Sequence, residues 1–211
     1  MTRGIAVAAA AYAFSCAEPG ATAAPTGLNL IPTAEVLPRR AASLELEATG
    51  SGLLPGRRST QAALSQIGLT SRLEAGLDHA LRHAPGDSLF NAKWQVVASA
   101  RGGPALAVGV QSVAGGYSAE RYLMLMQAVG SLRLHAGAFR AAGTTRLLAG
   151  LDRPLGTTVL QADHIGGGEG VTSVGLAVPL GRCLSLTYAI TFPTGRDPVG
   201  HLANLALLLG G

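Results

Sequence analysis

Polar side chains recur at every second position of otherwise apolar stretches, and these are the residues best placed to act together. Successive side chains of an extended strand point to opposite faces, so residues two apart share a face. Glu45 and Glu47, for example, alternate with Leu44, Leu46 and Ala48. The polar face comprises Glu45, Glu47, Glu74, Asp78, Asn91, Lys93, Gln95, Gln111, Arg133 and His135.

The charge of this polar face changes sign along the chain. Its acidic members come first, and Lys93, Arg133 and His135 follow. Around a closed lumen, opposing acidic and basic walls would hydrate a narrow pore and orient polar solutes. The alternative is a filled interior in which the same residues neutralise one another. Small residues on the same face favour open space slightly: Gly76, Ala107, Gly109, Gly137, Gly175 and Ala177.

The sequence gives only weak indications of a catalytic site or a metal-binding site. A hydrolase would need a nucleophile, a base and an orienting acid in contact, for example Ser185 and His135 with Glu74 or Asp78. Asp163 and His164 are neighbours, so on a strand they face opposite sides. His79 and His83 would pair only on a helix, where we expect a strand end and loop. We therefore predict no enzyme, no catalytic residues, no metal site and no cofactor.

The elements that must position the polar face are separated by a repeated turn. Tight glycine turns at Gly68, Gly130, Gly156 and Gly181, with another at Gly103, recur at steps of roughly 25 to 35 residues, the length of one hairpin of ten-residue strands. Between them lie longer, more polar segments, at residues 50–58, 82–88, 114–119, 140–145, 166–170 and 193–200. Short periplasmic turns that alternate with longer outer loops are typical of outer-membrane barrels.

Composition supports the same fold. The chain has 211 residues, of which 48% are hydrophobic and 13% charged, and its mean hydropathy is +0.33. No apolar run approaches the roughly 18 residues of a membrane-spanning helix. We predict an all-β, up-and-down antiparallel transmembrane β-barrel of about twelve strands, the first near residues 43–48 and the last near 202–209. Residues 122–127 are apolar on both faces, so their orientation stays open.

The N-terminus has the pattern of an export signal. Arg3 precedes an apolar run over residues 4–15, and Ala21, Thr22 and Ala23 form a small-residue cleavage site. We predict a signal peptide at 1–23, a periplasmic segment at 24–40 and an outer-membrane barrel at 41–211. A buried N-terminal helix and lipidation at Cys16 are the alternatives.

The arginines of the predicted outer loops suggest a binding partner at the membrane surface. Lipopolysaccharide phosphates would suit these cations, although plain solvation is the alternative. A net charge of +4 without a basic stripe argues against nucleic acid. The arginines of the outer loops are Arg57, Arg58, Arg82, Arg140 and Arg196.

The chain resembles the YjbH-like outer-membrane proteins. The resemblance rests on residues 27–38, which include Ile31-Pro32-Thr33-Ala34-Glu35, and on residues 68–77, 91–94 and 104–110. It implies a barrel in the Gram-negative outer membrane that is linked to exopolysaccharide or capsule production. It also implies contact with membrane lipid and with polysaccharide-export proteins, and it supplies no catalytic residues.

The expected function is therefore structural or transport-related. The expected process is exopolysaccharide or capsule export, or envelope maintenance. A transport role would use a narrow pore for polar solutes. Two alternatives belong to other classes. One is a soluble periplasmic β-protein that binds a lipid or glycan, and the other is an outer-membrane hydrolase.

Overall fold

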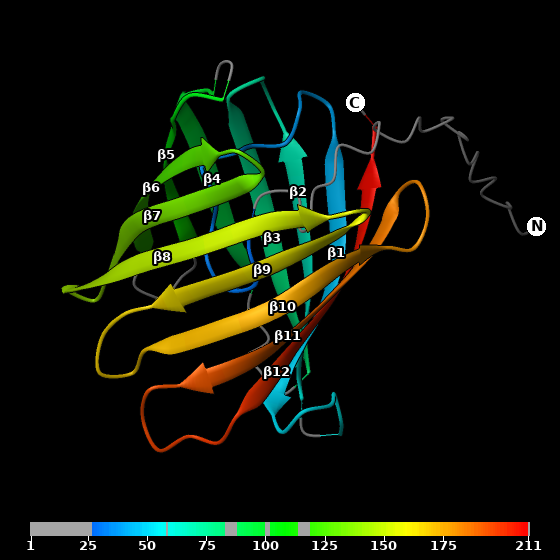
Figure 1. Cartoon of the computed structure of the whole chain (residues 1–211), viewed down its shortest axis with the longest axis vertical. Helices are drawn as coiled ribbons and strands as arrows, with labels where there is room; N and C mark the ends of the chain where they lie inside the picture. Colours follow the sequence, from blue (N-terminus) through cyan, green and yellow to red (C-terminus); the bar gives the residue numbers. More distant parts are fainter. Residues whose placement is uncertain (1–26, 58, 83–87, 100–101, 114–118, 211) are drawn as a thin grey trace, which may run out of the picture.

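Twelve antiparallel strands close into one barrel, in which each strand pairs with its neighbours in sequence and β1 pairs with β12 (Figure 1). The computed structural model describes residues 27–57, 59–82, 88–99, 102–113 and 119–210. The predicted all-β, up-and-down barrel is confirmed. The strands are β1 (Ala42–Ser51), β2 (Thr60–Gly68), β3 (Leu73–Arg82), β4 (Ser88–Val97), β5 (Ala105–Val113), β6 (Glu120–Val129), β7 (Leu132–Ala141), β8 (Thr144–Leu155), β9 (Thr158–Ile165), β10 (Val171–Pro179), β11 (Leu184–Pro193) and β12 (Gly200–Leu209).

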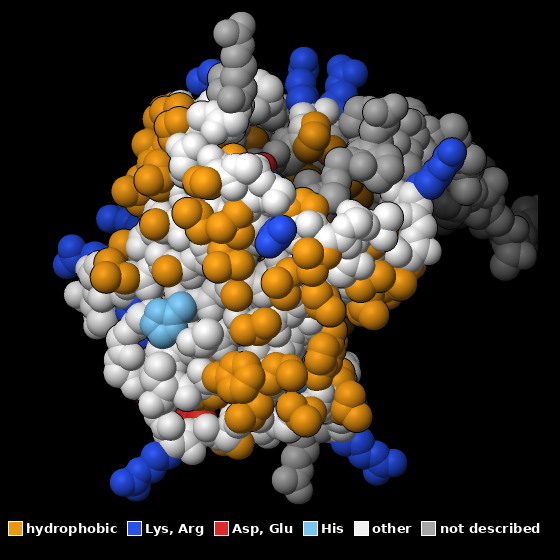
Figure 2. All heavy atoms as spheres, in the orientation of Figure 1, with side chains coloured by type: hydrophobic (Ala, Val, Ile, Leu, Met, Phe, Trp, Pro, Cys, Tyr) orange, Lys and Arg blue, Asp and Glu red, His pale blue; other side chains and the backbone are white. Residues whose placement is uncertain are grey.

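The two faces of the wall follow the alternation read from the sequence. Leu46 is 56% exposed and Trp94 is 53% exposed, whereas the neighbouring Glu45 and Lys93 are buried. Apolar side chains accordingly cover much of the visible outer wall, and most Lys and Arg side chains project around its margin (Figure 2). Within the part of the chain that the structure describes, no helix has the length and apolar character needed to cross a membrane.

The connections at the two ends mostly differ in length, with two departures from prediction. A tight turn was expected at Gly103, but β4 ends at Val97 and β5 begins only at Ala105, so this connection is longer. Residues 130–131 and 156–157 make tight turns, whereas the connections from β1 to β2 and from β11 to β12 are longer and lie at the opposite end. Residues 140–145 were expected to form another long loop, but there only Ala142 and Gly143 connect β7 to β8. Both residues have positive φ, the conformation of a tight hairpin turn. The strands therefore extend further at this point than composition indicated.

The orientation of β6 is settled by burial. Tyr122, Met124 and Met126 point into the barrel and are buried, whereas Leu123 and Leu125 are exposed on the outer wall. The interior therefore has an apolar region along β6, which water alone would not stabilise.

That apolar region is covered by the chain's own N-terminal part, which differs from the expected periplasmic segment. Residues 27–38, here called the inner segment, run inside the barrel as the blue trace in Figure 1. Leu28, Ile31 and Ala34 are buried in one cluster with residues of the wall. Leu37 is also buried, and Ala41 leads directly into β1. The predicted signal peptide at 1–23, Cys16 and residues 24–26 lie outside the described residues.

Candidate functional site

The inner segment divides the barrel interior into an apolar half and a polar half. In the apolar half its side chains pack on inward residues of β5, β6 and β8, which are Ala105, Ala107, Tyr122, Met124, Met126 and Leu148. Burial of this surface contributes about 25 cal/mol for each Å² removed from water. The segment therefore belongs to the core of the folded barrel.

Polar groups of the wall hold the backbone of the inner segment. The amide of Leu30 donates to Asp163 at 2.8 Å, and the amide of Leu37 donates to Glu74 at 2.8 Å. The Gln95 side chain donates to the Ala34 carbonyl at 2.7 Å. These bonds satisfy backbone groups that a buried irregular segment would otherwise leave without partners.

The basic residues of the predicted polar face are each paired inside the barrel. Lys93 Nζ lies 3.1 Å from a carboxylate oxygen of Glu74, its cross-strand partner. Arg133 contacts Asp152 at 2.7 Å and Glu35 of the inner segment at 2.9 Å. His135 Nε2 lies 2.8 Å from the other oxygen of Asp152. The alternative of internal ion pairs thus describes this part of the interior, because the three basic residues that the structure describes here are all paired with carboxylates.

Asp152 and Glu35 complete this network, and the sequence reasoning missed both. Asp152 is the cross-strand partner of Arg133 in the β7–β8 pair. A register drawn from the tight turn at residues 142–143 would have placed the two together. Glu35 had no such signal, because it belongs to a segment without alternation.

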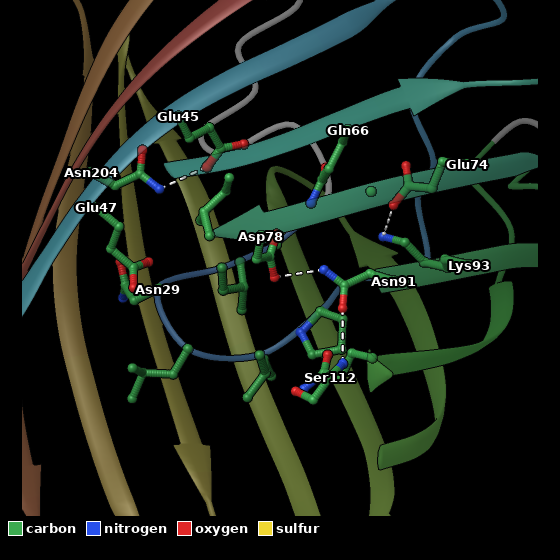
Figure 3. Close-up of a pocket in the computed structure, with 18 of the residues that line it drawn as sticks. Asn29, Glu45, Glu47, Gln66, Glu74, Asp78, Asn91, Lys93, Ser112 and Asn204 are labelled. Atoms are coloured by element: carbon green, nitrogen blue, oxygen red, sulfur yellow. Dashed lines mark hydrogen bonds and ion pairs between the residues drawn. The ribbon is translucent and has the colours of Figure 1, made fainter. Parts of the chain in front are cut away.

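A cavity of about 330 Å³ remains in the polar half. It lies between residues 27–32 of the inner segment and the wall of β1 to β6, β11 and β12. Figure 3 shows carboxylate and amide side chains converging on it above the blue inner segment. The predicted polar-face residues that line it are Glu45, Glu47, Glu74, Asp78, Asn91, Lys93 and Gln111.

The other predicted polar-face residues also point inward but serve the inner segment and its ion pairs. These are Gln95, Arg133 and His135. Two of the small inward residues were expected to leave open space, but neighbouring side chains occupy the space beside them. A Cβ on Gly109 would collide with the Tyr122 ring, and one on Gly175 would lie 2.7 Å from Asn29 Oδ1. Their small size admits an aromatic ring and the inner segment.

Two carboxylates of the cavity, Glu45 and Asp78, accept hydrogen bonds from neutral donors. Glu45 accepts hydrogen bonds from Ser43 Oγ at 2.6 Å and from Asn204 Nδ2 at 2.7 Å. Asp78 accepts one from Asn91 Nδ2 at 2.6 Å. Within the described part of the chain, no hydrogen bond or ion pair reaches the Glu47 carboxylate. The polar half is therefore acidic and rich in hydrogen-bond acceptors.

Residues considered for hydrolysis do not assemble. Asp163 contacts the inner segment, whereas His164 bonds Thr172 at 2.9 Å. No hydrogen bond joins Ser185 to a histidine among the described residues. Nor do those residues contain a group of three or more His, Cys, Asp or Glu side chains placed to hold a metal ion. His83 lies outside them.

A serine and a histidine that we did not single out do meet, where β2 and β12 begin. Ser59 Oγ lies 3.2 Å from His201 Nε2, and His201 Nδ1 lies 2.9 Å from the Gly52 carbonyl oxygen. With its proton on Nδ1, the imidazole donates to the carbonyl and accepts from the hydroxyl. Both side chains are buried, so the pair fastens the β1–β2 loop to β12.

The outward arginines gather at one end of the barrel. Arg57 and Arg196 lie in the β1–β2 and β11–β12 loops, and Arg82 and Arg140 lie near the ends of β3 and β7. All four are exposed at the end that carries the longer loops. Arg58 lies outside the described residues.

Comparison with known proteins identifies the fold. No family model and no curated protein matches the sequence. The KdgM porin matches with a TM-score of 0.59 at 8% identity, covering 78% of this chain and 98% of the porin. A KdgM porin in complex with disordered oligogalacturonate matches with a TM-score of 0.55 at 8% identity, covering 81% and 99%. An active-site mutant of outer membrane phospholipase A from Escherichia coli gives 0.51 at 13% identity, covering 83% and 91%. The chain thus has the fold of outer-membrane β-barrels.

Proposed function

We propose that this chain is an outer-membrane barrel that provides a narrow aqueous passage, restricted by its own inner segment. The observation that carries the proposal is the acidic cavity of about 330 Å³ beside the inner segment. An apolar outer wall supports placement in the membrane, because exposed Leu and Phe side chains are stable against lipid. Hydrated carboxylates inside such a wall concentrate cations and exclude anions.

Conductance in planar bilayers tests the passage. We expect small single channels with a reversal potential that favours cations across a salt gradient. The Glu47→Gln variant keeps the side-chain shape, removes one carboxylate charge and should weaken the cation preference. Glu169→Gln changes an exposed loop carboxylate and should leave the preference unchanged. Absence of conductance above background from correctly folded protein would refute the passage.

A role in exopolysaccharide or capsule export, or in envelope maintenance, is the biological part of the proposal. It rests on the resemblance of residues 27–38 to YjbH-like proteins, and residues 27–32 of this segment line one side of the cavity. Polysaccharide-export proteins are the corresponding partners. Surface polysaccharide should fall in cells that lack the protein and recover when it is restored, and an unchanged amount would count against this role.

Lipopolysaccharide is the proposed lipid partner at the loop end. The exposed Arg57, Arg82, Arg140 and Arg196 offer guanidinium groups that suit phosphate oxygens. Replacing these arginines by Gln should reduce retention of lipopolysaccharide during purification, measured by phosphate content. Equal retention by the variant would leave plain solvation as their role.

We propose no enzymatic function. The buried Ser59 and His201 are closed to a substrate, which supports a structural role for the pair. Hydrolysis of phospholipid or ester substrates by folded protein, abolished by Ser59→Ala, would overturn this part of the proposal.

A further inference from the structure

The cavity lining has more acidic side chains than cationic ones. Among the described residues that line it, Lys93 is the only one with a cationic side chain, and it pairs with Glu74. Glu45, Glu47 and Asp78 remain without a cation. Charges in a partly enclosed site interact more strongly than in bulk water, so these carboxylates attract a positive group.

The strand register brings these carboxylates together. Glu45 and Asp78 lie in one row across β1, β2 and β3, because both are cross-strand partners of Leu64. Glu47 is the cross-strand partner of Asn204 on the other side of β1. One group at the centre of this arrangement would therefore meet acceptors from both directions, as the side chains in Figure 3 indicate.

An unsatisfied amide oxygen supplies a second, independent indication of a ligand. Asn204, which lines the cavity, is only 6% exposed, and its Nδ2 donates to Glu45 while its Oδ1 has no hydrogen-bond partner. Buried acceptors in native proteins are normally satisfied, so the missing partner is a donor.

We propose that this cavity binds the protonated amine of a hydroxyl-bearing solute, with an amino sugar as the best chemical match. An ammonium group has three donors and no acceptor, which suits the Glu47 carboxylate and the Asn204 oxygen. Nearby amide side chains, such as Gln66 and Gln111, offer both donors and acceptors to sugar hydroxyls. A cavity of about 330 Å³ is large enough for one or two sugar rings. The inference rests on the proposed function and names the solute class of its passage.

Calorimetry on the full, detergent-folded barrel tests the inference with two matched probes. The first is the disaccharide of glucosamine, which carries free amines, and the second is its N-acetylated form. We expect the glucosamine disaccharide to bind at least about tenfold more tightly, because acetylation removes the charge. Glu47→Gln should weaken its binding by about tenfold, and Glu169→Gln should not change it.

Several outcomes would overturn the inference. Equal binding of both disaccharides would refute recognition of the ammonium group, as would undiminished binding by a Glu47→Gln variant that shows the heat-modifiable gel mobility of a folded barrel. Binding of ethanolamine as tight as that of the glucosamine disaccharide would refute the sugar part. Conductance of the same preparations separates the two proposals. Conductance without discrimination between the disaccharides contradicts only this inference, and binding without conductance contradicts only the passage.

Discussion

At the scale of single residues, the clearest feature is a buried carboxylate that serves two basic side chains. Asp152 is fully buried and contacts Arg133 through one oxygen and His135 through the other. Arg133 also reaches Glu35, so the network joins β7 and β8 to the inner segment. Removing one member of a buried ion pair leaves its partner without compensation, which costs more than the pair itself contributes.

We therefore expect Asp152→Ala to lower the free energy of unfolding by about 3 kcal/mol, because Arg133 and His135 lose their buried partner. Urea unfolding of the barrel in lipid vesicles measures this. The matched control is Glu169→Ala, which removes an ion pair with Arg146 whose glutamate side chain is 89% exposed. Its effect should stay below about 1 kcal/mol. Equal effects of the two substitutions would contradict the importance assigned to burial.

The Ser59–His201 pair gives a second prediction at this scale. Ser59→Ala should loosen the β1–β2 loop, because the His201 ring and the Gly56 amide both lose their contact with Oγ. A buried group without its partner costs about 1–3 kcal/mol. Faster trypsin cleavage after Arg57 in folded protein measures the change. Ser88→Ala is the control, since Ser88 bonds His79 at an exposed site, and it should not accelerate cleavage after Arg57.

At the scale of elements, the sequence predicted the strands well and the inner segment poorly. Alternation identified the inward Glu45 and the outward Trp94 because a strand with one face on lipid must keep a strict period of two. Residues 27–38 have no such period, and their position depends on contacts with strands far along the chain, such as the bond from Leu30 to Asp163. The apolar inner face of β6 was the available signal, since Met124 needs an apolar partner inside the barrel.

The fit of the inner segment against β8 leads to a prediction for that element. A Cβ on Gly150 would lie 2.5 Å from Leu28 Cδ1 and 3.0 Å from Ile31 Cδ1. Gly150→Leu should therefore displace the inner segment from the wall and enlarge the aqueous passage. We expect larger single-channel conductance in planar bilayers than for the unchanged protein.

Gly181→Leu is the control for this substitution, because a Cβ there meets nothing within 4 Å. Its conductance should match that of the unchanged protein. Heat-modifiable gel mobility verifies that both variants fold. A folded Gly150→Leu variant with unchanged conductance would show that the inner segment does not limit the passage.

At the scale of the whole molecule, the fold combines an apolar outer wall with an interior that is polar on one side only. The amount of apolar surface and the number of strands followed from composition and turn spacing. The division of the interior did not, because it depends on which inward residues the inner segment covers. Only three-dimensional placement distinguishes Lys93, which is paired beside Glu74, from a free cation of an open lumen.

The single tryptophan of the chain allows the membrane placement itself to be tested. Trp94 is 53% exposed on the outer wall of β4, and Leu73 is its cross-strand partner on β3. In lipid vesicles, phospholipids with brominated acyl chains should quench its fluorescence strongly, because the indole contacts the acyl chains directly. A Trp94→Phe, Tyr122→Trp variant carries its reporter on the inner face and should be quenched far less. A soluble β-protein would show no quenching of Trp94 by brominated lipid, so this measurement separates the barrel in the membrane from the periplasmic alternative.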